Sequence, residues 1–456
     1  NFFFFLLAEG AFSQAFIPVL TEYKTTKTHV EVQILISRVF GCLLTVISLL
    51  TVVAMVFAPA ILYLYAPGFH DDPEKFALVI DMFRLTIPYL LFMSLTAFAS
   101  SILNSYGSFS TPAFAPVLLN VAMIAAACLF TPYMAEPIMV LGWAVIAAGF
   151  LQLAIQIPEL WKKKLLIPPK VDFKHEGVDR ILKLMLPALF GVSVTQINLL
   201  LNTIWASFMQ HGSVSWLYSA ERMTELPLGL IGVAIGTVIL PSLSARHAEQ
   251  DQTKFRGMID WAAKVIMLVG IPASIALFML STPIIQALFQ RGQFTFEDTQ
   301  MTAMALQCMS AGVIAFMLIK VFAPGFYALQ DTKTPVRVGL MAVAANAILN
   351  VIFIGIFKLI DWHAEHMALA LASSGSALVN AGMLYFYLHK KNIFRFGAHW
   401  KKLFIQFAIA NIVMVGALYY ALTWYNGDVS QWIRVVEVLG LCVVGVVAYL
   451  LGLLAT

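Results

Sequence analysis

The fold is decided by residues 213–246, which read SVSWLYSAERMTELPLGLIGVAIGTVILPSLSAR. The apolar character of this stretch predicts one long membrane helix over 213–245, with prolines at two positions inside it. Three charged residues, Glu221, Arg222 and Glu225, lie near its start. Each charge near the centre of a membrane helix costs about 2.5–3.5 kcal/mol on insertion scales, so these residues need an explanation.

Two interpretations of this charged patch stay open. Arg222 and Glu225 are three residues apart and therefore share one helix face. Charged residues inside membrane spans normally face the bundle interior or a wet cavity, where they serve function. The alternative is an internal ion pair that only fixes helix packing.

The composition of the chain indicates a membrane protein. Of its 456 residues, 61% are hydrophobic and only 11% are charged. The mean hydropathy is +0.86. A soluble domain carries about 25% charged residues, and apolar runs long enough to cross a bilayer recur throughout this chain. Its four cysteines stand singly and form no CxxC pattern, so neither a metal site nor a disulfide framework is expected.

Thirteen spans are predicted. They lie near 2–20, 34–62, 76–105, 113–132, 137–157, 180–210, 213–245, 256–287, 299–329, 336–357, 365–388, 402–424 and 432–454.

Lysine and arginine alternate sharply between the loops that connect these spans. The loops on one side hold 18 cationic residues, whereas those on the other side and their edges hold four. The positive-inside rule places the 18-cation side in the cytoplasm. The net charge of +4 therefore reflects topology, and nucleic acid is not an expected partner.

An internal repeat underlies this pattern. Three sequence patterns recur at a nearly constant separation along the chain. They are Pro18 with Pro241, Thr111-Pro112 with Thr334-Pro335, and Leu64 and Gly68 with Leu288 and Gly292. Six helices separate equivalent positions, so the halves share one orientation in the membrane and form parallel repeats.

The predicted fold class is an all-α polytopic membrane protein with two parallel-repeat six-helix lobes and two accessory helices. We expect an N-terminal lobe over 1–157, a basic cytoplasmic linker over 158–177, a C-terminal lobe over 178–390 and an accessory helix pair over 391–456. The repeat further predicts that the intact protein has fourteen spans and that its first helix precedes Asn1.

Four ionisable residues are candidates for binding a substrate: Glu9, Arg222, Glu225 and Lys320, which lie deeper within the predicted spans than the others. Lys320 comes four residues before Pro324, where its helix is expected to bend, and there function and packing are equally good explanations. A site that combines cations with carboxylates suits a large substrate with an anionic head group, because arginine matches phosphate oxygens with a fork of donors.

Three motifs of the sequence resemble a known family. They are AEGAFSQAFIPVLTEYK (Ala8–Lys24), SVSWLYSAERMTELPLGLIGVAIGTVILPSLS (Ser213–Ser244) and KVFAPGFYALQDTKTPV (Lys320–Val336). They are similar to the MurJ/MviN family of lipid II flippases, and the similarity runs through nearly the whole chain. It implies membership of the multidrug/oligosaccharidyl-lipid/polysaccharide exporter superfamily.

The resemblance implies a function and a site. It implies transport of lipid-linked peptidoglycan precursor from the inner to the outer leaflet by alternating access. Arg222 and Glu225 would line the central cavity, and Arg222 would meet the pyrophosphate. The accessory pair would border a groove for the lipid tail.

The chain departs from the family pattern at its start. Members usually carry two arginines before the first motif, where this chain has Phe4 and Phe5. Arginines of the family's first helix are also absent from the sequence. The resemblance to the family's cationic cavity is therefore partial.

Other functions remain possible. An exporter of another lipid-linked oligosaccharide would share the pyrophosphate chemistry, whereas a multidrug exporter for cationic drugs would favour acidic and aromatic residues over Arg222. An intramembrane enzyme is disfavoured, because HExxH and GxSxG motifs are missing from the sequence. The expected partners are lipid II and membrane lipids, with no cofactor, no metal and a monomeric state.

Overall fold

The computed structural model describes residues 11–134, 136–249, 251–329, 331 and 333–456. These residues form helices and connecting turns, with no β-strand in the described part. Ten helical segments among them are long and apolar enough to cross a membrane by length and composition. The prediction of an all-α polytopic membrane protein is confirmed.

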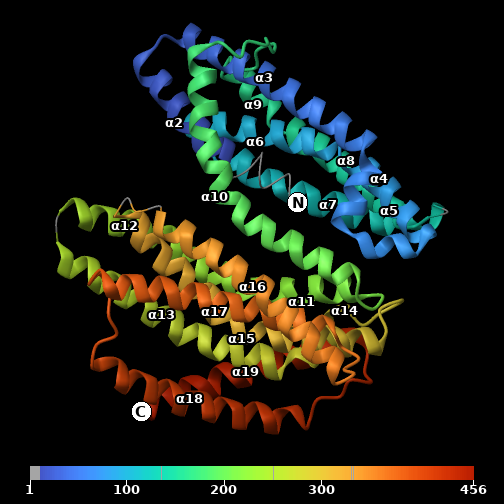
Figure 1. The fold of residues 1–456 in the computed structure, drawn as a ribbon, viewed down its shortest axis with the longest axis vertical. Helices are drawn as coiled ribbons and strands as arrows, with labels where there is room; N and C mark the ends of the chain where they lie inside the picture. The colour runs from blue at the N-terminus through green and yellow to red at the C-terminus, as the bar shows by residue number, and fades with distance from the viewer. Residues whose placement is uncertain (1–10, 135, 250, 330, 332) are drawn as a thin grey trace. The chain divides into compact units, whose positions relative to one another are not determined.

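The chain folds as two compact units, residues 1–204 and 205–456 (Figure 1). The helices of the first unit are α2 (Ala11–Thr26), α3 (His29–Val56), α4 (Ala58–Tyr65), η2 (Pro67–Asp71), α5 (Pro73–Thr86), α6 (Tyr89–Ser105), α7 (Ser110–Leu129), η3 (Thr131–Tyr133), α8 (Met139–Ala154), α9 (Ile157–Lys162) and most of α10 (Glu176–Ser207). The second unit contains α11 (Ser213–Pro227), η4 (Leu228–Val233), α12 (Ala234–Ala248), α13 (Gln252–Met279), α14 (Ser281–Phe289), α15 (Phe296–Tyr327), α16 (Lys333–Leu359), α17 (His366–Lys390), α18 (His399–Leu422) and α19 (Gln431–Leu454).

The separation between Pro18 and Pro241 recurs in the helix bounds. Both ends of α13 follow the corresponding ends of α3 by this separation. The starts of α14, α15 and α16 follow the starts of α4, α5 and α7 in the same way. These equivalent helices therefore begin at corresponding positions in the two units.

Two predicted spans of the first unit are each divided into two helices. The span 34–62 is divided at Phe57, and the span 76–105 at Ile87 and Pro88. Proline explains both breaks, because Pro59 and Pro88 cannot donate a backbone hydrogen bond. The prediction of one continuous helix in each place was wrong, although Pro73–Ser105 remains a single candidate membrane span by length and composition.

The basic linker is bound along α3. Ser37 on α3 donates a hydrogen bond to the carbonyl oxygen of Pro168 at 2.7 Å, and the Lys170 amide donates to the carbonyl oxygen of Ser37 at 3.1 Å. A Cβ at Gly41 would lie 2.4 Å from the Lys170 backbone, so glycine is required for this close approach. We call residues 163–175 the strap.

Helix α10 contributes to the cores of both units. Near its start, Val178 and Ile181 are buried with Leu35 in the core of the first unit. In its last turn, Ala206 is buried with Ile354 in the second. The boundary between the two compact units, at residue 204, therefore lies later in the chain than the predicted start of the C-terminal lobe at 178.

The accessory pair, α18 and α19, packs against α13 and α14 within the second unit (Figure 1). The Trp400 indole donates a hydrogen bond to Asp260 Oδ1 at 2.7 Å, and the Tyr449 hydroxyl donates to the carbonyl oxygen of Leu268 at 2.7 Å. These buried bonds attach both accessory helices to α13.

Exposed aromatic residues mark one end of the accessory pair. Tyr420, Trp424 and Trp432 are 65%, 73% and 79% exposed. Tyrosine and tryptophan are enriched where a membrane meets water. This end belongs to the side that the loop charges assign away from the cytoplasm.

Cysteine labelling tests this orientation. In a variant without the native cysteines, of which Cys128 and Cys442 are exposed, we expect Asp72→Cys to react with a membrane-impermeant maleimide in intact cells. Lys162→Cys is expected to react only after permeabilisation, because it lies on the cation-rich side. Both side chains are exposed, so a difference in labelling by the reagent shows on which side of the membrane each residue lies. The opposite pattern of labelling would reverse the assigned topology.

Candidate functional site

The charged patch lies on α11, directly before a change in helix type. The predicted single helix over 213–245 is instead an α-helix that ends at Pro227, a π-helical turn and a second α-helix. Pro227 causes the change, because it lacks an amide proton and its ring crowds the carbonyl of Met223 one turn earlier. π-Helical turns are frequent at functional sites.

Arg222 and Glu225 form an ion pair that remains accessible. Arg222 Nη1 donates to Glu225 Oε2 at 2.7 Å, and the two side chains are 46% and 50% exposed. The Arg222 guanidinium also lies over the Tyr218 ring, 4.8 Å from its centroid. Cation–π stacking and the carboxylate hold the guanidinium plane in place and leave other N–H groups for an anion.

Tyr218 is a residue that the charge-based reasoning missed. It precedes Arg222 by four residues and is half exposed. Side chains four residues apart on a helix are neighbours, so the spacing of an aromatic residue and an arginine is the signal that identifies it. We refer to Tyr218, Arg222 and Glu225 as the α11 triad.

Lys320 lies beside the helical segment that follows the α11 triad. Lys320 is exposed on α15, and a Cβ at Gly232 would lie 3.7 Å from its Cγ. A Cβ at Gly236 would lie 3.4 Å from its carbonyl oxygen. Gly232 follows Arg222 by ten residues, which corresponds to roughly 15 Å along a helix. The fourth predicted residue, Glu9, lies outside the described residues.

The motif that begins at Lys320 also supplies a structural contact. Asp331 accepts hydrogen bonds from the Thr334 amide at 3.0 Å and the Thr334 hydroxyl at 2.7 Å, and it pairs with Lys391. Burial alone would raise the pKa of Asp331, but the bonds from Lys391 and Thr334 outweigh it and hold the pKa at about 2. Asp331 is therefore ionised at neutral pH and caps α16.

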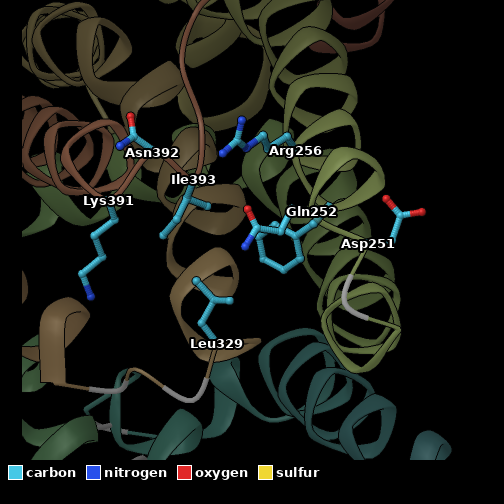
Figure 2. A pocket seen from close by; sticks show the side chains of 8 residues that line it. Asp251, Gln252, Arg256, Leu329, Lys391, Asn392 and Ile393 are labelled. Atoms are coloured by element: carbon cyan, nitrogen blue, oxygen red, sulfur yellow. The ribbon is translucent and has the colours of Figure 1, made fainter.

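A separate cavity of about 380 Å³ opens beside α13 and the end of α17 (Figure 2). Its charged lining residues are mostly engaged elsewhere. Asp251 pairs with Lys254 at 2.9 Å, and Lys391 pairs with Asp331. Among the described residues, no three histidine, cysteine or carboxylate side chains gather as metal ligands, here or elsewhere.

The fold and the α11 triad together define a class of protein. An all-helical membrane protein of two repeated units, with a charged residue held inside an apolar span, has the features expected of a transporter. The same fold occurs in a solved structure of low sequence identity. An inward-facing multidrug resistance MATE family transporter of the MOP superfamily matches with a TM-score of 0.70 at 14% identity, covering 86% of this chain and 88% of the other.

Closer similarity is found to lipid II flippases. The sequence profile described as "Lipid II flippase MurJ" matches residues 1–439. The chain is 41% identical to the probable lipid II flippase MurJ of Haemophilus influenzae, with 95% of this chain and 85% of the relative covered. It is 40% identical to that of Vibrio cholerae, covering 100% and 87%.

A solved structure titled "Lipid II flippase MurJ, inward closed conformation" matches with a TM-score of 0.80 at 26% identity, over 99% of this chain and 88% of the other. The chain belongs to the MurJ lipid II flippase family. The resemblance seen in the three sequence motifs is confirmed.

Proposed function

We propose that this protein moves lipid II from the inner to the outer leaflet of the bacterial cytoplasmic membrane by alternating access. Membership of the family and the two-unit transporter fold support this function. The observation that carries it is the accessible Arg222, held beside Tyr218 and Glu225 within an otherwise apolar stretch. Lipid II is anchored by a pyrophosphate, an anion that arginine binds through paired hydrogen bonds.

In the proposed mechanism Arg222 exchanges one anionic partner for another. Glu225 holds the guanidinium while the site is empty of substrate, which avoids an unpaired charge within the membrane. The pyrophosphate then replaces the carboxylate, and Tyr218 keeps the guanidinium plane oriented. After release, Arg222 returns to Glu225 and the site is reset.

The remaining assignments belong to the same proposal. Glu9 and Lys320 contribute charge elsewhere along the substrate path, the accessory pair borders the lipid tail, and the protein acts as a monomer among membrane lipids. The functional lobes are 1–157 and 178–390, joined by the linker 158–177. An exporter of another lipid-linked oligosaccharide is the second candidate, because Arg222 would serve the same pyrophosphate.

Reconstituted vesicles test the function. With fluorescent lipid II placed in one leaflet, we expect the protein to make it accessible to a membrane-impermeant quencher on the other side. A lipid of the same chain length with a zwitterionic head group is the control and should stay protected. Equal movement of both lipids, or of neither, would contradict the proposal.

A further inference from the structure

The first unit contains a second polar cavity, which is separate from the α11 triad in the chain and chemically different. It has a volume of about 430 Å³ and is lined by residues of α2, α6, α7 and α8. Thr96, Ser100 and Asn104 lie four residues apart along α6 and so form one stripe on a helix face. None of the described residues that line this cavity is charged.

Two buried polar side chains of the cavity can bond to a ligand. Thr96 is 7% exposed, and its hydroxyl makes no hydrogen bond among the described residues. Gln152, 2% exposed, accepts a bond from the Tyr89 hydroxyl at 3.2 Å through its oxygen and carries an amide NH₂ with two donors. A buried hydroxyl without a partner costs about 1–3 kcal/mol, so a ligand that bonds to Thr96 is favoured.

Other polar groups of the cavity are already engaged and serve to fix its walls. The hydroxyls of Ser13 and Ser101 are 3.1 Å apart and join α2 to α6. Gln156, which lies between α8 and α9, donates to the Ser100 hydroxyl at 3.0 Å and joins that junction to α6. Contacts with α2 and with the α8–α9 junction therefore fix the position of α6 in the absence of a ligand.

The chemistry of the cavity suits an uncharged ligand that both donates and accepts hydrogen bonds. The described lining residues of the cavity carry no charge, so they offer an ion no compensation for lost water. Its hydroxyls and amides alternate with apolar side chains, including the ring of Phe109, and its volume falls within the 300–1,000 Å³ typical of small-molecule sites. A sugar ring with hydroxyl and acetamido groups has this combination of polar edges and apolar faces.

The cavity lies towards the cytoplasmic end of the first unit. Asn104 is one residue before Ser105, whose carbonyl oxygen accepts a hydrogen bond from Lys24 at 2.8 Å. Lys24 belongs to the cation-rich side that the positive-inside rule places in the cytoplasm. This is the side from which a lipid-linked precursor of the inner leaflet is loaded.

We propose that this cavity binds an N-acetylated sugar of the substrate head group, separately from the pyrophosphate. The proposal rests on the proposed function and identifies which part of the substrate the first unit recognises. Hydrogen bonds from Thr96 and Gln152 replace water on the sugar hydroxyl and acetamido groups, and Phe109 covers an apolar face of the ring.

Binding measurements with two lipids test the proposal. The purified full chain in nanodiscs is titrated with undecaprenyl-pyrophosphate that carries the N-acetylated disaccharide, and with undecaprenyl-pyrophosphate alone. We expect Thr96→Val to weaken binding of the sugar-bearing lipid about fivefold to tenfold, as the loss of one hydrogen bond does. Its affinity for the sugar-free lipid should be unchanged.

Ser94→Ala is the matched control. Ser94 lies on the same helix and is 1% exposed, but its hydroxyl bonds to the carbonyl oxygen of Leu90 at 2.8 Å and does not line the cavity. This variant should bind both lipids as the wild type does. Ala97→Met fills the cavity with an apolar side chain and is expected to weaken binding of the sugar-bearing lipid only. Folding of each variant is checked by thermal unfolding.

The outcomes separate this proposal from the proposed function. Suppose that the wild type translocates lipid II, but that Thr96→Val and Ala97→Met bind both lipids normally or lose affinity for both equally. The proposed sugar site is then wrong, and the proposed function stands. If the wild type neither prefers the sugar-bearing lipid nor translocates it, the function itself fails.

Discussion

Replacing Arg222 by methionine is expected to reduce lipid II translocation by about tenfold to a hundredfold, the range expected for losing hydrogen bonds to a charged group. Folding must be checked in parallel, because Arg222→Met leaves Glu225 without its partner. The measurement is translocation in reconstituted vesicles, with thermal unfolding recorded on the same preparations.

A double variant separates binding from charge balance. If Arg222 only neutralises Glu225, Arg222→Met with Glu225→Gln should restore transport, since no unpaired charge remains. If Arg222 binds the pyrophosphate, the double variant should be as inactive as Arg222→Met. Arg222→Lys should also be impaired, because a point charge loses the paired geometry and the stacking on Tyr218. A double variant with normal transport would make Arg222 a packing residue.

The largest expected effect on stability comes from Gly312→Ala. Helices α15 and α17 meet at this glycine, where a Cβ would lie 2.7 Å from Ser374 Oγ and 2.8 Å from Ser374 Cα. Rotation of the serine side chain removes only the first of these clashes, so the helices must separate. We expect the free energy of unfolding to fall by about 1–3 kcal/mol, as for other overpacked cores.

Gly382→Ala provides the matched control. Gly382 lies on α17, one of the same two helices, and a Cβ at this position would meet no atom within 4 Å. Alanine there should leave stability unchanged or raise it by up to about 1 kcal/mol, because it favours the helix. The measurement is thermal unfolding of the purified protein. A similar change for both variants would show that helix propensity, and not the contact with Ser374, determines the result.

Much of the architecture could be predicted from patterns that are local in the chain. Apolar length predicted membrane-spanning helices, and the separation of the internal repeat recurs in the bounds of α3 and α13. The breaks at Phe57 and Ile87 were missed because apolar periodicity continues through them. The π-helical turn after Pro227 was missed because proline can end, bend or widen a helix, and packing against neighbouring helices decides which.

The candidate site could be predicted only where its residues are neighbours on one helix. The spacing of Arg222 and Glu225 placed them on one helix face, where they form an ion pair. Lys320 was grouped with them because it is charged and lies in a predicted span. The sequence does not show how far Lys320 lies from Arg222 once the helices pack together. The cavity beside Thr96 was missed because uncharged hydroxyls are common in membrane helices. They indicate a binding site only when several helices pack together and bring them to one cavity.

The strap and α10 have a consequence for the order of events during synthesis. The strap's partners on α3 precede it in the chain, so the first unit can complete its core as soon as α10 emerges. The cluster around the last turn of α10 is completed later, because Ala206 shares it with Ile354, which is translated only after α11 to α15 and most of α16. At a synthesis rate of about 5–20 residues per second, this interval is roughly 7–30 seconds. Until then the cluster around Ala206 holds only members that are near it in the chain, such as Val214 and Leu217.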